Sequence, residues 1–132
     1  MAWVEVFAIL VVSHLVGDYL LQTDWQAKHK RGGLGPNRES QRALAAHIFT
    51  YTLAYVPAFI WLAGELGAEL VAVVALVSIP HWIQDDGRLL TVYLAKVKGP
   101  GAAANRTVAA AADQSFHLLA LLLLSFLVDT WS

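Results

Sequence analysis

Histidine and aspartate recur as pairs in this 132-residue chain, and the two members of each pair are four positions apart in the sequence. Three such pairs are present: His14 with Asp18, His81 with Asp85, and Asp113 with His117. Residues four apart on an α-helix share one face, so the side chains of a pair can hold one ion between them. Imidazole and carboxylate together are ligands that suit Zn²⁺, Mn²⁺ or Fe²⁺. The spacing therefore predicts a divalent-metal site.

A fourth histidine, His47, joins this set because it opens another apolar run. The seven residues exceed what one tetrahedral zinc ion needs. Either two metals are bound, or some carboxylates orient histidine ligands, or one aspartate acts as a general base. The metal ligands that we expect are His14, Asp18, His47, His81, Asp85, Asp113 and His117. The remaining histidine, His29, lies in a basic loop, and we expect it to be solvated.

Four apolar segments must position these side chains. The chain is 58% hydrophobic and 14% charged, whereas soluble domains carry about 25% charged residues. A membrane-spanning helix needs about 20 mostly apolar residues, and four segments qualify: 2–22, 43–63, 68–85 and 108–128. The predicted fold class is all-α and integral to the membrane, a bundle of four transmembrane helices that forms a single domain over residues 1–132.

The distribution of lysine and arginine predicts the orientation of this bundle. All nine of these residues lie between the first and second segments or between the third and fourth. The short connection between the second and third segments has none, and carries Glu65 and Glu69 instead. The positive-inside rule then places the two long loops in the cytoplasm and both termini outside. The net charge of −1 argues against nucleic acid as a partner.

This topology places the seven candidate ligands at a similar depth. The four segments alternate in direction, yet each ligand falls in the cytoplasmic part of its segment. Because the orientation rests on Lys and Arg alone, this agreement is independent of the histidines and aspartates. Facing helices of a bundle are known to build carboxylate-histidine metal sites. Absence of cysteine excludes disulfides and thiolate metal sites.

Hydrolysis is the chemistry that we expect from such a site. A bound metal would lower the pKa of a bound water and polarise an ester or phosphoryl oxygen. One of Asp18, Asp85 and Asp113 would act as the general base, and Arg88 would hold a phosphate by paired hydrogen bonds. The substrate would be a lipid or a lipid-linked headgroup, because such a molecule reaches this depth from the surrounding membrane lipids.

Other functions fit the same residues. A hydrogen bond between His and Asp that joins two helices would explain one isolated pair. A channel or transporter of protons or divalent cations would use the cluster as a transient site, in a homo-oligomer because four spans are few for a carrier. The nearly continuous apolar outer halves at 2–12 and 118–128 favour a one-sided site over a path across the membrane. A scaffold that docks a partner through its basic loops is a third possibility.

The motifs resemble those of a widespread bacterial family of small membrane proteins, catalogued as a domain of unknown function (3307 type). The similar runs are HLVGDYLLQTDWQAKHK, AHIFTYT, HWIQDDGR and DQSFHLLAL. The residues that match its pattern are His14, Asp18, Gln22, His47, His81, Asp85, Asp113, Gln114 and His117. At DDGR the family pattern has a lysine closer to the aspartate, and Arg88 would take that role. The resemblance implies a shared polar site in a multi-pass protein of the bacterial cytoplasmic (inner) membrane, and implies no reaction.

Overall fold

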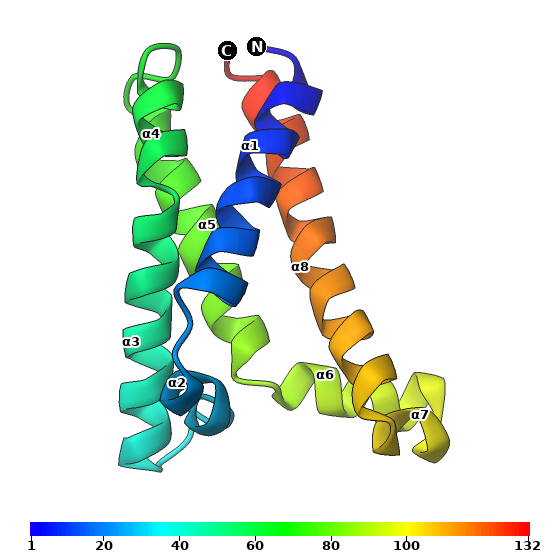
Figure 1. Ribbon diagram of the computed structural model, residues 1–132. Helices are drawn as coiled ribbons and strands as arrows, with labels where there is room; N and C mark the ends of the chain where they lie inside the picture. Colours follow the sequence, from blue (N-terminus) through cyan, green and yellow to red (C-terminus); the bar gives the residue numbers. More distant parts are fainter.

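The computed structural model describes the whole chain, from Met1 to Ser132, as helices without strands. Four long helical segments run between two ends of the molecule (Figure 1). These segments are α1 (Trp3–Leu15) with the π-helical turn η1 (Val16–Leu20), α3 (Arg38–Ala54) with α4 (Val56–Ala63), α5 (Glu69–Asp85), and α8 (Arg106–Asp129). The two long connections contain α2 (Asp24–His29), α6 (Arg88–Tyr93), the π-helical η2 (Leu94–Lys98) and α7 (Pro100–Ala104).

Side-chain caps determine where several of these helices begin. The Asn37 side chain accepts a hydrogen bond from the Ser40 N–H at the start of α3. Asn105 accepts from the backbone of the first turn of α8 in the same way. Thr23 and Gln26 form a reciprocal capping box at the start of α2. These residues bond backbone N–H groups that would otherwise lack partners, so the polar connections end at defined positions.

The predicted second span is bent. Helices α3 and α4 meet at Tyr55 with an angle of 46° between them. Pro57 lies in the first turn of α4, where its missing N–H is tolerated but where it cannot continue the hydrogen bonding of α3. Pro80, in contrast, lies inside α5 without ending that helix.

The long helices pack around an apolar core in the part of the bundle towards the termini. Helix α8 contacts both α1 and α5, and α5 also contacts α3. The buried core residues are Val6, Leu10, Tyr51, Tyr55, Leu62, Leu66, Val73, Val77, Leu121, Leu124 and Val128. The packing holds the four segments together, and it leaves their other ends free to present polar side chains to one another.

Two helical segments are long and apolar enough to cross a membrane, namely Trp3–Leu20 and Arg106–Asp129. The bent pair of α3 and α4 would make a third. Helix α5 has 17 residues, a length of about 25 Å against a hydrocarbon core of about 30 Å. The all-helical class is therefore confirmed, and the four-span arrangement stays a prediction.

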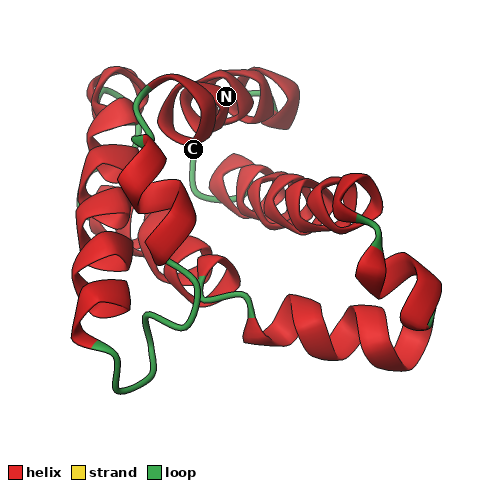
Figure 2. Ribbon diagram, turned by 60° about the horizontal axis from the view of Figure 1, so that its bottom comes forward, coloured by secondary structure: helices red, strands yellow, loops and turns green.

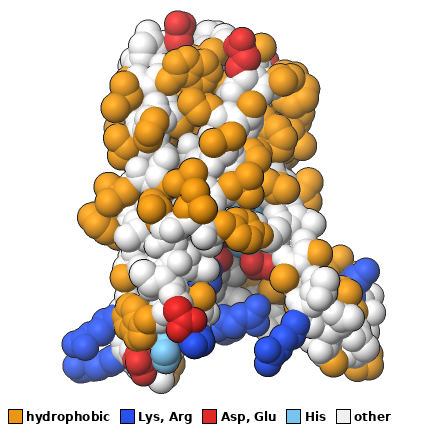
Figure 3. Space-filling model, viewed as in Figure 1, with side chains coloured by type: hydrophobic (Ala, Val, Ile, Leu, Met, Phe, Trp, Pro, Cys, Tyr) orange, Lys and Arg blue, Asp and Glu red, His pale blue; other side chains and the backbone are white.

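The surface is divided between an apolar body and a charged end. Apolar side chains are spread over the body of the visible face, while Lys and Arg gather at the end away from the termini (Figure 3). The termini lie together, with the amino group of Met1 donating a hydrogen bond to Ser132 Oγ over 2.9 Å. Figure 2 shows the short helices of the second connection as a bridge that leads round this charged end to the start of α8.

Candidate metal centre

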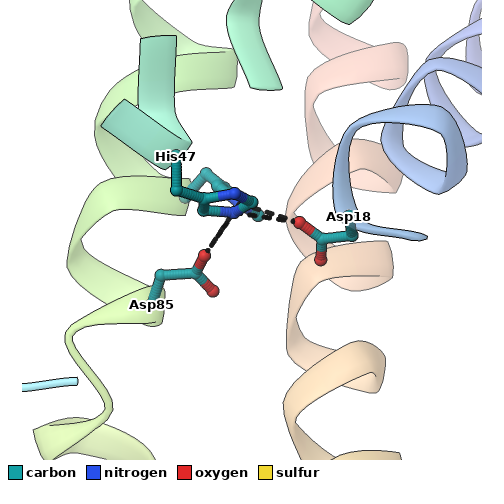
Figure 4. Close-up of side chains that lie close together, drawn as sticks. Asp18, His47 and Asp85 are labelled. Carbon is teal, nitrogen blue, oxygen red and sulfur yellow. Dashed lines mark hydrogen bonds and ion pairs between the residues drawn. The ribbon is translucent and has the colours of Figure 1, made fainter. Parts of the chain in front are cut away.

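Three helical segments bring Asp18, His47, His81 and Asp85 together. Asp18 comes from η1, His47 from α3, and His81 and Asp85 from the last turns of α5. All four are buried, with at most 7% of any residue exposed. In Figure 4 the carboxylates of Asp18 and Asp85 point towards the His47 ring from two sides.

The four donor atoms form a compact set. Nε2 of His47 lies 2.8 Å from Asp85 Oδ2 and 3.2 Å from Asp18 Oδ1. Nε2 of His81 lies 3.1 Å and 3.2 Å from the same two oxygens, and the two Nε2 atoms are 3.1 Å apart. A tetrahedral ion with bonds of about 2.0–2.1 Å keeps its ligand atoms roughly 3.3 Å apart. Five of the six distances in this set are therefore close to those of a tetrahedral site.

Hydrogen bonds account for only part of this convergence, such as the bond between the His47 and His81 rings. Asp18 Oδ1 is buried and has no hydrogen-bond partner, although both imidazoles lie 3.2 Å away. The Nδ1 atoms of His47 and His81 also lack partners. Two buried carboxylates that converge repel each other unless a cation lies between or beside them. A bound divalent cation would satisfy both the charge and the orphaned oxygen.

A second group adjoins the first and shares Asp85. Asp85, Asp113 and His117 have ligand atoms within 4.8 Å of one another. The His117 Nδ1–H donates to the Asp113 carbonyl oxygen over 2.7 Å, because a carbonyl can only accept. In a neutral ring this leaves Nε2 free to bind a metal ion, and Nε2 lies 3.2 Å from Asp85 Oδ1. Asp85 thus directs Oδ2 to the first group and Oδ1 to the second, as a carboxylate that bridges two ions would.

His14 lies beside the four donors instead of among them. Its Nε2–H donates to Gln114 Oε1 over 2.8 Å, and its Nδ1 accepts from the Tyr51 hydroxyl over 3.0 Å. The Gln114 amide in turn donates to Asp18 Oδ2 over 3.2 Å. Both ring nitrogens of His14 are therefore used, and the His14–Gln114 pair orients the Asp18 carboxylate. Such outer partners fix the geometry of metal ligands in general.

Lys30 is a site residue that sequence reasoning missed. Its Nζ donates to Asp85 Oδ2 over 2.7 Å, and its side chain is 15% exposed. In the sequence, Lys30 reads as one of several basic loop residues that set the orientation. The capping box at Thr23 and Gln26 predicts the short helix α2 in this loop. That signal indicates a helix there, but it does not indicate that the residue after the helix returns to the cluster.

Arg88 lies apart from both groups. Its Nε donates to Asp86 Oδ2 over 2.6 Å, and its side chain is 61% exposed. Asp86 also accepts from the Leu34 N–H over 2.8 Å, so it joins the two long connections. Burial alone would raise the pKa of the Asp86 carboxyl, but the Arg88 guanidinium and the Leu34 N–H hold that pKa below its usual range. The structure therefore places Arg88 in an ion pair within the second connection, where it supports the Asp86 carboxylate that joins the two loops.

Two cavities meet at Asp113, the most accessible member of the cluster with a side chain 23% exposed. One cavity, of about 660 Å³, lies at the charged end and is lined by Lys30 and other basic residues. The other, of about 170 Å³, is mostly apolar and lies between α5, α6 and α8. Asp113 can thus be reached from outside the bundle, whereas the other members of both groups are enclosed.

The comparisons with known proteins point to a single family. A family model described as "Protein of unknown function (DUF3307)" matches residues 6–132, a range that includes every residue of both groups. No curated protein and no solved structure matches the chain.

Proposed function

We propose a function for this chain, which belongs to the family described as protein of unknown function (DUF3307), from the chemistry of its buried cluster. We infer that it is a membrane-embedded metalloprotein. One divalent ion would lie between Asp18, His47, His81 and Asp85, and a second between Asp85, Asp113 and His117. The observation that carries this proposal is the set of four donor atoms from three helical segments, separated by 2.8–3.2 Å across five of their six pairs.

The donor set suits a borderline divalent ion. Imidazole nitrogen and carboxylate oxygen, without thiolate, favour Zn²⁺, Mn²⁺ or Fe²⁺ over soft ions. The short distances favour zinc for the first position, because zinc accepts four ligands at about 2.0–2.1 Å. The second position has fewer protein ligands and borders the cavities, and this leaves coordination sites for a substrate.

The reaction that we propose is hydrolysis of an ester or phosphoryl bond in a lipid headgroup at the cytoplasmic leaflet. A metal bound here would activate a water and polarise the bond to be cleaved. Asp113 would hold the second ion through one carboxylate oxygen, and we assign proton acceptance to its other oxygen, because the carboxylate lies at the junction of the cavities. Asp18 and Asp85 would hold the ions, and His14 and Gln114 would keep Asp18 oriented.

A cation or proton channel is less well supported. Such a path needs polar side chains that continue from the cluster to the other end of the bundle. The buried residues there belong to the apolar core, with Ser125 as the buried polar residue of that half of α8. This distribution favours a site that opens to one side.

The test is metal content in the purified, detergent-solubilised protein after loading with Zn²⁺, Mn²⁺ or Fe²⁺. We expect about two ions per wild-type chain, about one after His117→Ala, and close to none after Asp85→Asn, because Asp85 contributes to both groups. His29→Ala is the matched control, since His29 is an exposed histidine on α2, and it should bind as the wild type does. The proposed metal centre would be contradicted by a wild type that binds no metal, or by an Asp85→Asn variant that binds as much metal as the wild type.

Hydrolysis is tested separately with the loaded protein and phospholipid in mixed micelles. We expect release of headgroup or fatty acid by the wild type and by His29→Ala, and no release by Asp85→Asn. Full metal content without any release would agree with the proposed metal centre but would contradict the proposed hydrolase activity.

A further inference from the structure

We propose that the substrate is an anionic phospholipid, with its phosphate in the basic cavity beside Asp113 and its apolar chain in the adjoining pocket. The inference rests on the proposed function, because it assigns a substrate class to the same site. It depends on three features: unpaired cations in one cavity, an apolar lining in the next, and the placement of both relative to the apolar surface.

Two of the four cations that line the basic cavity have no side-chain partner. Lys28, Lys30, Arg31 and Arg106 line it, with Asp113 as its acid. Lys28 pairs with an aspartate on α2 and Lys30 with Asp85, but neither Arg31 nor Arg106 bonds to any side chain. Guanidinium groups bind phosphate through paired, charge-assisted hydrogen bonds. Figure 3 shows a hollow at this end, with acidic atoms inside it and Lys and Arg around it.

The apolar pocket begins where the basic cavity ends. Asp113 lines both, and the pocket's other walls come from α5, α6 and α8. The rings of Tyr93 and Phe116 meet edge to face in it, with centroids 5.0 Å apart. A further cavity of about 390 Å³ shares these two rings and extends along α8 from Val108 to Leu119, with Lys98 also in its lining. Together they make a mostly apolar track that begins beside Asp113 and lies along α8.

This order of cavities matches an amphiphile and not a free phosphate. The cations lie at the charged end, and the track lies along α8, a helix that is apolar enough to cross a membrane. Nearby, Leu89 and Val92 on α6 and Val97 on η2 are more than half exposed. Apolar residues beside Lys96 and Lys98 are typical of a segment that lies in the membrane interface. A lipid in that leaflet would enter with its headgroup already facing the cations.

Lys30 connects the phosphate position to the metal centre. It lines the basic cavity, and its Nζ lies 2.7 Å from Asp85 Oδ2. A phosphate held by Arg31 and Arg106 would therefore meet a cation that already contacts the bridging carboxylate. Lys30 acts in this account as a positioning residue, which draws the headgroup towards the reacting atoms.

The experiment measures binding of short-chain lipids to the full-length, metal-loaded protein in detergent. The ligands are dihexanoyl phosphatidylglycerol, dihexanoyl phosphatidylcholine with the same chains, and glycerol 3-phosphate as the soluble headgroup. The variants are Arg31→Gln/Arg106→Gln in the cavity, and Phe116→Ala in the track. The matched control is Arg38→Gln/Arg42→Gln, which removes the same charge from α3 outside the cavity.

We expect the wild type to bind phosphatidylglycerol at least about tenfold more tightly than either other ligand. Arg31→Gln/Arg106→Gln should lose about tenfold or more of that affinity, and the α3 control should stay within about twofold of the wild type. Phe116→Ala should weaken the lipid but leave glycerol 3-phosphate unchanged. Equal affinity for the two lipids, an equal loss in the α3 control, or glycerol 3-phosphate binding as tightly as lipid would each overturn the proposal.

Metal content measured on the same samples separates this proposal from the metal centre. Loss of lipid selectivity in Arg31→Gln/Arg106→Gln at wild-type metal content supports the lipid site. A wild type that holds metal but does not distinguish the lipids overturns the lipid site and leaves the metal centre. A wild type that selects phosphatidylglycerol but holds no metal supports the lipid site and overturns the metal centre.

Discussion

Asp85 uses each of its carboxylate oxygens for a different partner. Oδ2 faces His47, His81 and Lys30, while Oδ1 faces His117. A carboxylate with 1% of its side chain exposed is stable as an anion only with cations close by. Lys30 supplies one such cation, and we propose that bound metal supplies the others. The Lys30 ammonium group and a metal ion would therefore compete for the same oxygen, Asp85 Oδ2.

That competition predicts the effect of Lys30→Gln. Removing the ammonium group leaves Asp85 Oδ2 free to bind metal more strongly, so metal affinity should rise by about tenfold. Competition with a fluorescent chelator measures this change. Lys28→Gln is the control, because Lys28 is exposed and pairs with Asp24 at the surface, and its metal affinity should not change. A fall in metal affinity in Lys30→Gln would contradict the role that we give to Lys30.

The π-helical turn η1 is the element that places Asp18. Gly17 lies in this turn against α3, where a Cβ atom would come within 2.6 Å of Tyr51 Cδ2. The Tyr51 ring in turn stacks on the His81 imidazole, with centroids 3.5 Å apart. Single π turns inside helices occur often at functional sites. The close approach of η1 and α3 therefore sets the positions of two candidate ligands, Asp18 and His81.

Gly17→Ala should disturb both ligands through Tyr51. An added methyl group in a packed contact typically costs 1–3 kcal/mol, so we expect a lower melting temperature together with reduced metal content. Thermal unfolding in detergent and elemental analysis measure the two effects. Gly101→Ala provides the comparison, because no atom lies within 4 Å of the added Cβ there. A Gly17→Ala protein as stable and as rich in metal as the wild type would show that the contact is not required.

Helical spacing in the sequence predicted the long helices well, but it did not predict the contacts that His14 and Lys30 make with distant residues. The apolar runs correctly indicate α1, α5 and α8, and the four-residue spacing places His81 and Asp85 on one face. The His14–Asp18 pair also lies on one face, with His14 Nε2 3.7 Å from Asp18 Oδ2, but this distance is too long for a hydrogen bond. His14 instead bonds to Gln114, a partner 100 residues away. Local spacing carries no information on such a contact, nor on the return of Lys30 to Asp85.

At the scale of the whole molecule, the charged and the apolar surfaces follow one another along the length of the bundle. The termini lie at the end away from Lys and Arg, and apolar side chains cover the body between (Figures 1 and 3). Helix α5 is short for a span, yet it also exposes apolar side chains such as Val71 and Ile79 along its length. We therefore propose that all four segments lie in the membrane, with both long connections in the cytoplasm.

Cysteine labelling tests this orientation, because the native chain has no cysteine. In right-side-out membranes, Ser132→Cys should react with a membrane-impermeant maleimide. Gly101→Cys, in the second long connection, should react only after permeabilisation. The reverse pattern, or equal labelling of both positions in sealed membranes, would contradict the proposed topology and the position of the site at the cytoplasmic side.

The most direct test of the metal centre is an anomalous difference map at the zinc absorption edge, from crystals of the zinc-loaded protein. The account predicts a peak about 2.0–2.2 Å from His47 Nε2, His81 Nε2 and the nearest oxygens of Asp18 and Asp85. It would be contradicted by a map without a peak at this position, in which the four side chains bond only to one another and to Lys30.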